Sequence, residues 1–186
     1  MSDTSKVYVP KPQAGGAVST APQGTAWPTD AVAPLNPEFK NLGFLNESGC
    51  VESTATENTE IKAWGGTVVK TSQTSFSKSW KMGFIEVNEH VFKEIYGPEN
   101  VSVDDLNGTI SIVGTSAEKA EHPWVIETLL DENTVERLII PLGKITEVGD
   151  VTYSTDGPIS FEVTITAYPF EGEKLFLREI ASLDRG

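Results

Sequence analysis

The chain has 186 residues, 38% of them hydrophobic and 22% charged, with a single cysteine and a formal net charge of -13 at pH 7. This length and composition predict one globular domain and exclude a membrane-spanning helix, since no stretch approaches the roughly 20 apolar residues that a span requires. Cys50 has no partner for an internal disulfide, and the scattered Lys and Arg residues exclude the clustered cations with which proteins bind nucleic acid tightly.

Residues 1–40 predict an extended N-terminal arm in front of a β domain of residues 41–186. The arm shows no sustained helical or alternating pattern, and prolines interrupt it throughout. Residues 7–9 and 17–20 can still form short isolated strands, because the prolines lie at their borders. We expect the arm to lie on a neighbouring chain. Residues 1–6 are polar and no apolar segment follows them, so we expect no secretory signal and assembly in a cytosol.

From residue 42 onward the pattern predicts β-strands. Residues 42–46 and 67–70 are short strands, and the second of them follows the turn at Gly65-Gly66. Residues 74–86 form the clearest strand, with Phe76, Trp80, Met82 and Phe84 on one side and mostly Ser and Lys on the other. Such alternation predicts one face on a core and the other toward water or a partner.

One helix is predicted after residue 88. Asn88 is the N-cap, Val87 and Phe92 occupy the positions of a hydrophobic staple, and Gly97-Pro98 ends the helix. Its apolar residues form one stripe, which we expect to close an open end or face of the sheet structure: Val91, Phe92, Ile95 and Tyr96.

Strands return in the second half of the chain. We expect a strand at 109–113, followed by a hairpin of 124–130 and 135–140 around the turn 131–134. A second hairpin consists of 148–154 and 159–167 around the turn at Asp156-Gly157, and a last strand lies at 174–180. The density of strands predicts a mainly β fold, a β-sandwich or barrel with one flanking α-helix.

Signatures of catalysis are missing from the sequence, so we expect no enzyme, no cofactor and no metal site. No Gly-rich loop followed by Lys and Ser or Thr is present to bind phosphates. His90 and His122 have no helical or hairpin relation to each other, so a zinc site on them would need added carboxylates. The acidic pairs fall in predicted turns, where solvated acids are the expected composition.

Six residues are candidates for an interface between copies of the chain. Trp27 lies in the arm, where no local core exists, so it could fill a pocket on an adjacent subunit; packing on its own domain is the alternative. Trp64 precedes Gly65-Gly66 and anchors a loop, whereas Trp80 and Trp124 belong to the core. The complete set of candidates is Trp27, Pro28, Pro34, Leu35, Phe39 and Trp64.

Several segments resemble the major tail tube proteins of siphophages, a superfamily that includes the tubes of type VI secretion systems. The resemblance is carried by residues 30–44 (DAVAPLNPEFKNLGF), 59–66 (TEIKAWGG), 71–76 (TSQTSF), 84–89 (FIEVNE) and 91–97 (VFKEIYG). It implies a structural subunit of the virion that forms homohexameric rings. These rings stack into a tube, which joins tape measure and terminator proteins and conducts DNA without binding it specifically.

The acidity suggests a hypothesis for such a conduit, in which acidic residues line the channel and repel DNA so that it slides. An acidic outer wall is the alternative. Two other functions are compatible with the sequence. One is a phage decoration or surface module, such as a carbohydrate-binding β-sandwich, and the other is a hydrolase whose two carboxylates lie about 5 to 10 Å apart across a pocket.

Overall fold

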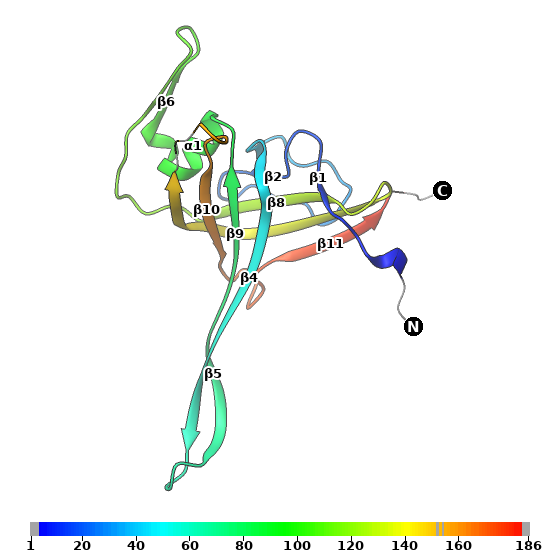
Figure 1. Cartoon of the computed structure of the whole chain (residues 1–186), viewed down its shortest axis with the longest axis vertical. Coiled ribbons are helices and arrows are strands. Elements are labelled where there is room, and N and C mark those ends of the chain that lie inside the picture. The colour runs from blue at the N-terminus through cyan, green and yellow to red at the C-terminus, as the bar shows by residue number, and fades with distance from the viewer. Residues whose placement is uncertain (1–3, 152, 154, 184–186) are drawn as a thin grey trace.

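The computed structural model describes residues 4–151, 153 and 155–183 (Figure 1). Short 3-10 helices occupy Thr4–Lys6 and Pro98–Asn100, and the α-helix α1 spans Glu89–Tyr96. The strands are β1 (Lys11–Pro12), β2 (Val18–Thr20), β3 (Lys40–Asn41), β4 (Leu45–Lys62), β5 (Val68–Phe84), β6 (Val101–Asp104), β7 (Thr109–Ile112), β8 (His122–Leu129), β9 (Thr134–Val151), β10 (Phe161–Ala167) and β11 (Leu177–Ser182). The predicted mainly β fold with one flanking α-helix is confirmed.

One large antiparallel sheet folds over on itself to make the body. Its strand order is β3-β2-β8-β9-β10-β5-β4, with β1 added to β8 and β11 added to β9. The long strand β9 belongs to both layers, because its first half pairs with β8 and β11 and its second half pairs with β10. Figure 1 shows β8, β9 and β11 crossing the direction of β4, β5 and β10, as in a sandwich with orthogonal packing.

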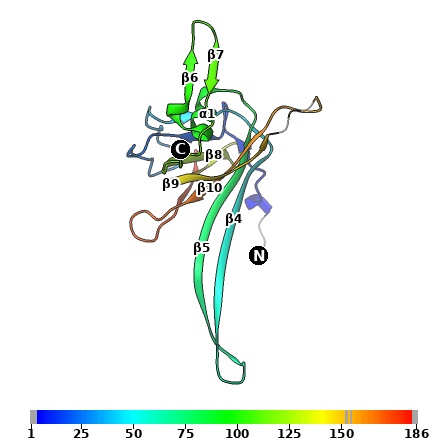
Figure 2. The same ribbon diagram turned by 90° about the vertical axis from the view of Figure 1, so that its left-hand side faces the viewer.

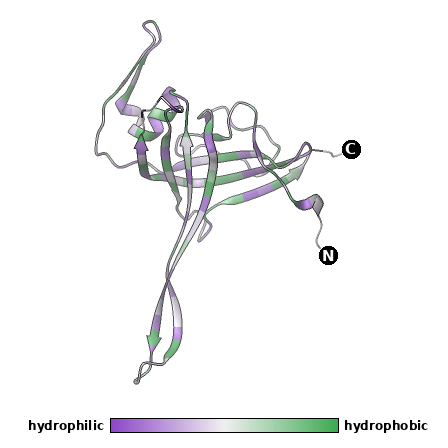
Figure 3. Ribbon diagram, viewed as in Figure 1, coloured by the Kyte–Doolittle hydropathy of each residue, from purple (hydrophilic) through white to green (hydrophobic). Residues whose placement is uncertain are grey.

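The core lies between these two layers and is closed at one end by α1. Alternation places the apolar side chains inside, as β10 shows with every second residue buried from Phe161 to Ala167. Hydrophobic and hydrophilic residues alternate along the strands of the body (Figure 3). The fully buried side chains include Trp80, Met82 and Phe84 of β5, Trp124 of β8, and Val91 of α1.

The helix follows the predicted signals. The Asn88 side chain accepts a hydrogen bond from the backbone N–H of Val91 at 2.9 Å, and Gly97 ends the helix with φ of 96°. Val87, the expected partner of Phe92 in a staple, is 61% exposed. The stripe closes the end of the sandwich as expected, because Phe92 meets Phe161 of β10 edge to face at a centroid distance of 5.3 Å.

Three strands are longer than the sequence pattern indicates. The predicted strands at 67–70 and 74–86 are joined in the single strand β5. β4 continues from Leu45 to Lys62, well beyond the predicted strand at 42–46, and pairs along its length with β5. The predicted strands at 135–140 and 148–154 belong to the single strand β9 as far as Val151, where β9 ends. Tyr153 is not in a strand, and residues 152 and 154 lie outside the described part. The predicted strand at 7–9 is wrong, since the first strand is Lys11–Pro12.

The arm is largely part of the body. β2 lies between β3 and β8 in the main sheet, and Val18 has no exposed surface. Residues 17–21, Ala31 and Phe39 are buried on their own body, so the expectation that the arm of residues 1–40 lies on a neighbouring chain is wrong for these residues. Little in the local pattern indicates this arrangement, because β2 has only three residues and Pro22 follows it closely. The described residues before Ala17 are mostly exposed.

Gly143 marks the place where β9 passes from one layer to the other. A Cβ atom there would lie 2.5 Å from Cδ1 of Trp124, whose indole N–H donates to the Gly143 carbonyl at 3.2 Å. We expect Gly143→Ala to lower the free energy of unfolding by about 1 to 3 kcal/mol, because the buried indole must move. Gly114→Ala, where nothing lies within 4 Å, is the matched control in thermal melts.

Candidate assembly surfaces

The β4–β5 hairpin projects far beyond the body (Figures 1 and 2). Its cross-strand pairs run from Leu45 and Phe84 at the base to Lys62 and Val68 near the tip, with three shifts of register on the way. Nearly all of its residues between 47 and 77 are exposed on both faces. A two-stranded ribbon of this length is only marginally stable in water, so its exposed part is suited to contact another molecule.

The hairpin ends in an apolar tip. Trp64 is fully exposed, and the two glycines that follow it have positive φ angles of 104° and 90°. Ile61, Val68 and Val69 nearby are each at least 44% exposed. Turns normally carry polar residues, so a cluster of large apolar side chains at the most remote point of the molecule is typical of a contact surface.

A charged cluster fixes the base of the hairpin to β11. Glu52 on β4 forms ion pairs with Lys78 of β5 and Arg178 of β11, and it accepts a hydrogen bond from the indole of Trp80 at 3.2 Å. Phe176 packs edge to face on Trp80. These contacts determine the direction in which the hairpin leaves the body.

Low pH should weaken the interactions of Glu52 in this cluster. Burial alone would raise the pKa of Glu52, but the hydrogen bond from Lys78 and the charge of Arg178 hold it below its ordinary value of 4.5. A carboxyl with a lowered folded pKa stabilises the fold above its unfolded pKa, and this contribution is lost as the pH falls through the folded value. Thermal melts should therefore show Glu52→Gln less stable than wild type at neutral pH and equal to it in strong acid. Glu47→Gln, at an exposed position, is the control.

Two long stretches of strand in the main sheet have a neighbouring strand on one side only. β4 is the last strand of its sheet and pairs only with β5, and the second half of β9, residues 144–151, pairs only with β10. These are the two edges of one four-stranded layer, β9-β10-β5-β4. Backbone N–H and C=O groups on an exposed edge can pair with a strand of another chain.

Part of the arm is held by a buried arginine. Arg137 is 4% exposed, and its Nη1 donates hydrogen bonds of 2.8 Å to the carbonyls of Asp30 and Ala33. Its Nε and Nη2 donate to the Glu127 carboxylate on β8. Arg137 is not among the residues predicted from the sequence, although a single arginine among the apolar residues of 135–140 could have indicated it.

The six candidate interface residues do not lie together on one surface of the structure. Phe39 is buried at 9% exposure, and Leu35 and Trp27 pack around the same small cluster with Val125 and Ile139. Trp27 also meets Phe170 edge to face at a centroid distance of 5.8 Å, so it packs on its own domain. Pro28 is half-buried, whereas Pro34 and Trp64 are exposed. Trp64 thus lies apart from the other five.

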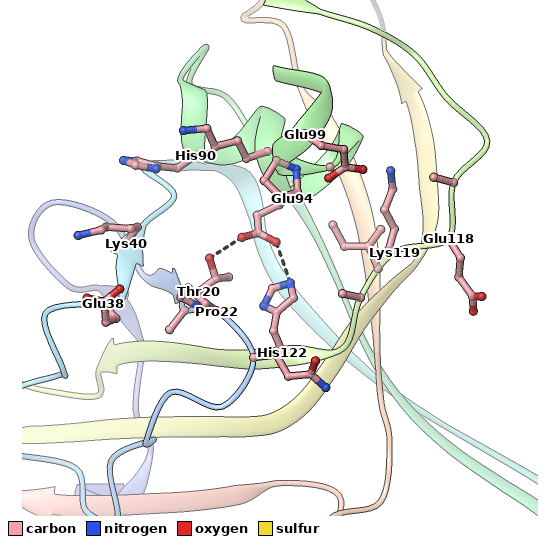
Figure 4. Close-up of a pocket in the computed structure, with 18 residues that line it drawn as sticks. Thr20, Pro22, Glu38, Lys40, His90, Glu94, Glu99, Glu118, Lys119 and His122 are labelled. Atoms are coloured by element: carbon pink, nitrogen blue, oxygen red, sulfur yellow. Dashed lines mark hydrogen bonds and ion pairs between the residues drawn. The ribbon is translucent and has the colours of Figure 1, made fainter. Parts of the chain in front are cut away.

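A groove of about 520 Å³ lies beside α1 (Figure 4). The Glu94 carboxylate of the helix accepts a hydrogen bond of 2.8 Å from the Thr20 hydroxyl, and its other oxygen lies 2.8 Å from Nε2 of His122, so it connects α1 to both β2 and β8. These contacts occupy both oxygens of the carboxylate in structural roles. Among the described residues, no three His, Cys, Asp or Glu side chains are grouped so as to hold a metal ion, and no helix is long and apolar enough to cross a membrane.

A β-rich body with two open sheet edges and a projecting hairpin defines a class of protein, the self-assembling structural subunit. Comparison with known families agrees with this class. The chain belongs to the phage tail tube protein family, whose profile matches residues 2–177. The resemblance to tail tube proteins that the sequence predicted is confirmed. The members of this family are structural proteins of the phage tail.

A search of solved structures found similarity to a chain described as "Virion of native gene transfer agent (GTA) particle". The identity is 12%, the TM-score is 0.38, and the match covers 79% of this chain and 92% of the other. A search of curated proteins found no match.

Proposed function

We propose that six copies of this chain close into a ring and that the rings stack into a tail tube through which DNA leaves the capsid. The observation that carries the proposal is the pair of open edges on the four-stranded layer, together with the projecting hairpin. By extension from the family, the tube joins tape measure and terminator proteins and assembles in the host cytoplasm.

The two open edges support ring formation. If β4 of one copy pairs with the second half of β9 of the next copy, each contact is head-to-tail and the series can close. The edge of every layer is then covered, which removes the hazard that an exposed edge strand presents. Six four-stranded layers, at about 4.8 Å per strand, give a backbone circumference of roughly 115 Å and a diameter of roughly 37 Å.

The hairpin supports stacking. It extends along the longest axis of the molecule and away from α1, which lies at the other end of the body (Figures 1 and 2). A contact between the hairpin of one ring and the body of the next ring is head-to-tail. A series of such contacts along the ring axis does not close on itself, so it generates a tube of indefinite length. The same contact would cover the exposed faces of the ribbon and its apolar tip.

Electron microscopy of the purified chain tests this function directly. We expect hollow tubes after prolonged incubation at high protein concentration, and six-fold symmetry in end-on views and averaged images. Light scattering should show a matching increase in mass. If the protein stays monomeric in the presence of preformed tail ends that supply a starting ring, the proposed function is wrong.

A further inference from the structure

The β6–β7 hairpin is a small sheet with one apolar and one polar face. In the described part of the chain its two strands pair only with each other. Residues directly opposite each other in an antiparallel pair point to the same face. Four apolar residues therefore share one face, which we call the apolar side of β6–β7: Val101, Val103, Ile110 and Ile112. The other face is polar: Ser102, Asp104, Thr109 and Ser111.

The apolar side of β6–β7 is only partly covered by its own chain. Val101 and Ile110 pack against the core beside α1, whereas Val103 and Ile112 are each 38% exposed. The turn of residues 105–108 follows the last cross-strand pair and is not part of this side. A two-stranded hairpin is marginally stable in water, and exposed large apolar side chains on it are typical of a contact surface.

The two hairpins of the molecule project in opposite directions. β6–β7 lies at one end of the longest axis and the tip of β4–β5 at the other, and in both views the two tips lie close to one line along this axis (Figures 1 and 2). When copies are stacked head-to-tail along the axis, β6–β7 of one copy points toward β4–β5 of the next.

The longer hairpin has the reach to lie beside the shorter one. Ten residues separate Glu52, at the base of β4–β5, from Lys62 near the tip, so at about 3.3 Å per residue this part spans about 33 Å. The four-residue strands of β6–β7 span about 13 Å. A β4–β5 hairpin can therefore pass along the whole of β6–β7 and still reach the body of the same neighbour.

The far part of β4–β5 has the side chains that such a contact needs. Residues 58–73 carry exposed large apolar side chains that can cover the apolar side of β6–β7: Ile61, Trp64, Val68 and Val69. This segment has two lysines and one glutamate, a net charge of +1, whereas residues 97–115 around β6–β7 have three acids and no base, a net charge of -3. Most surfaces of a chain with a net charge of -13 repel those of another copy, so two segments of opposite sign are matched partners.

We propose that the apolar side of β6–β7 is the surface on which the β4–β5 hairpin of a second copy, in the adjacent ring, is seated; this rests on the proposed tube function. Val103 and Ile112 would then be covered by apolar residues of segment 58–73. Each subunit is held at both ends, since it inserts its long hairpin into one neighbouring ring and presents its short hairpin to the other.

Disulfide cross-linking tests which copies meet at this surface. In a Cys50→Ser background, Val103→Cys is combined in turn with Ile61→Cys, Val68→Cys and Val69→Cys. Oxidation of preformed tubes should join successive rings, so at least one of the three variants should give covalent chains with more subunits than one ring holds. Ser102→Cys, on the polar face of the same strand, replaces Val103→Cys in the control and should give few such chains.

Two outcomes of the cross-linking would overturn the inference. If none of the three variants forms covalent chains although all of them form tubes, the hairpins do not meet. If the largest product has no more subunits than one ring holds, the apolar side of β6–β7 is covered by a lateral neighbour within the ring.

Removal of the exposed apolar side chains tests what the contact contributes. Val103→Ser with Ile112→Ser should raise the protein concentration needed for tube growth at least about tenfold, because two apolar side chains per copy are no longer buried. Ser102→Ala with Ser111→Ala, on the polar face, is the control and should grow tubes as wild type does. Thermal melts of the monomers show whether both variants are folded.

The failure of this inference can be told apart from the failure of the proposed function. Normal tube growth by the folded serine variant would overturn the inference alone. If the serine variant does not fold, the cross-linking decides, because it keeps Ile112 and changes one residue of β6–β7 only. Absence of tubes from the wild-type chain would instead contradict the proposed function.

Discussion

Shortening the β4–β5 hairpin should abolish tube growth while leaving the folded body intact. The change removes residues 58–73 and joins Glu57 to Thr74 through an Asn-Gly turn, which suits a tight hairpin. The removed residues are exposed, so the melting temperature of the monomer should change little. Each copy would lose its most remote apolar contact, and because loss of one interface hot spot costs about 2 kcal/mol or more, six such losses per ring should prevent stacking.

Electron microscopy and sedimentation measure the outcome, with rings or monomers expected in place of tubes. Trp64→Ser is the smaller version of the same change and should shorten the tubes. Leu106→Ser is its matched control, because Leu106 is also almost fully exposed at a hairpin tip, between β6 and β7. Tubes of normal length and number from the shortened chain would show that the hairpin does not hold rings together.

Local signals explain why parts of this fold could be predicted from the sequence. The helix has a side-chain cap at Asn88 and a glycine at its end, and each of these acts within a few residues. β10 alternates without exception, and the turn between β8 and β9 is short and polar. In these elements the residues that determine the structure lie next to one another along the chain.

The β4–β5 hairpin could not be predicted in full because much of β4 lacks the local pattern that indicates a strand. From Glu47 to Glu60 the strand β4 is rich in Ser, Thr, Asn and Glu and has no alternating apolar residues. Burial of one face normally supplies that alternation. A strand exposed on both faces in the monomer carries no such pattern, and in the proposed tube its partner surfaces belong to other copies.

The candidate interface could be predicted only in part, for a similar reason. An aromatic residue outside a recognisable strand can fill a pocket on a neighbouring chain, or it can pack in a small hydrophobic cluster on its own chain. The sequence pattern is the same in both cases. Trp27 and Phe39 joined such a cluster with Val125 and Ile139, residues about a hundred positions away in the chain. Among the three aromatic candidates, only Trp64, which is isolated at the hairpin tip, has the exposure that an interface role needs.

Replacing Arg137 should have the largest effect on the stability of the single chain. The guanidinium links three segments, because it pairs with Glu127 of β8 and donates to the carbonyls of Asp30 and Ala33. Arg137→Met would leave a largely buried carboxylate and two carbonyls without their donor. Removing one partner of a buried pair costs about 3 to 5 kcal/mol. In a domain of this size that corresponds to a fall in melting temperature of roughly 6 to 20 °C.

A double-mutant comparison separates the charge from the hydrogen bonds to the arm. Arg137→Met with Glu127→Leu removes both charges and should recover about half or more of the lost stability, because well-packed apolar residues can replace a buried ion pair. The hydrogen bonds from Arg137 to the carbonyls of Asp30 and Ala33 are still lost in this variant, so hydrogen exchange at residues 30–33 should remain faster than in wild type. Equal stability of the single and double variants would show that the arm contacts, and not the ion pair, account for the effect of Arg137.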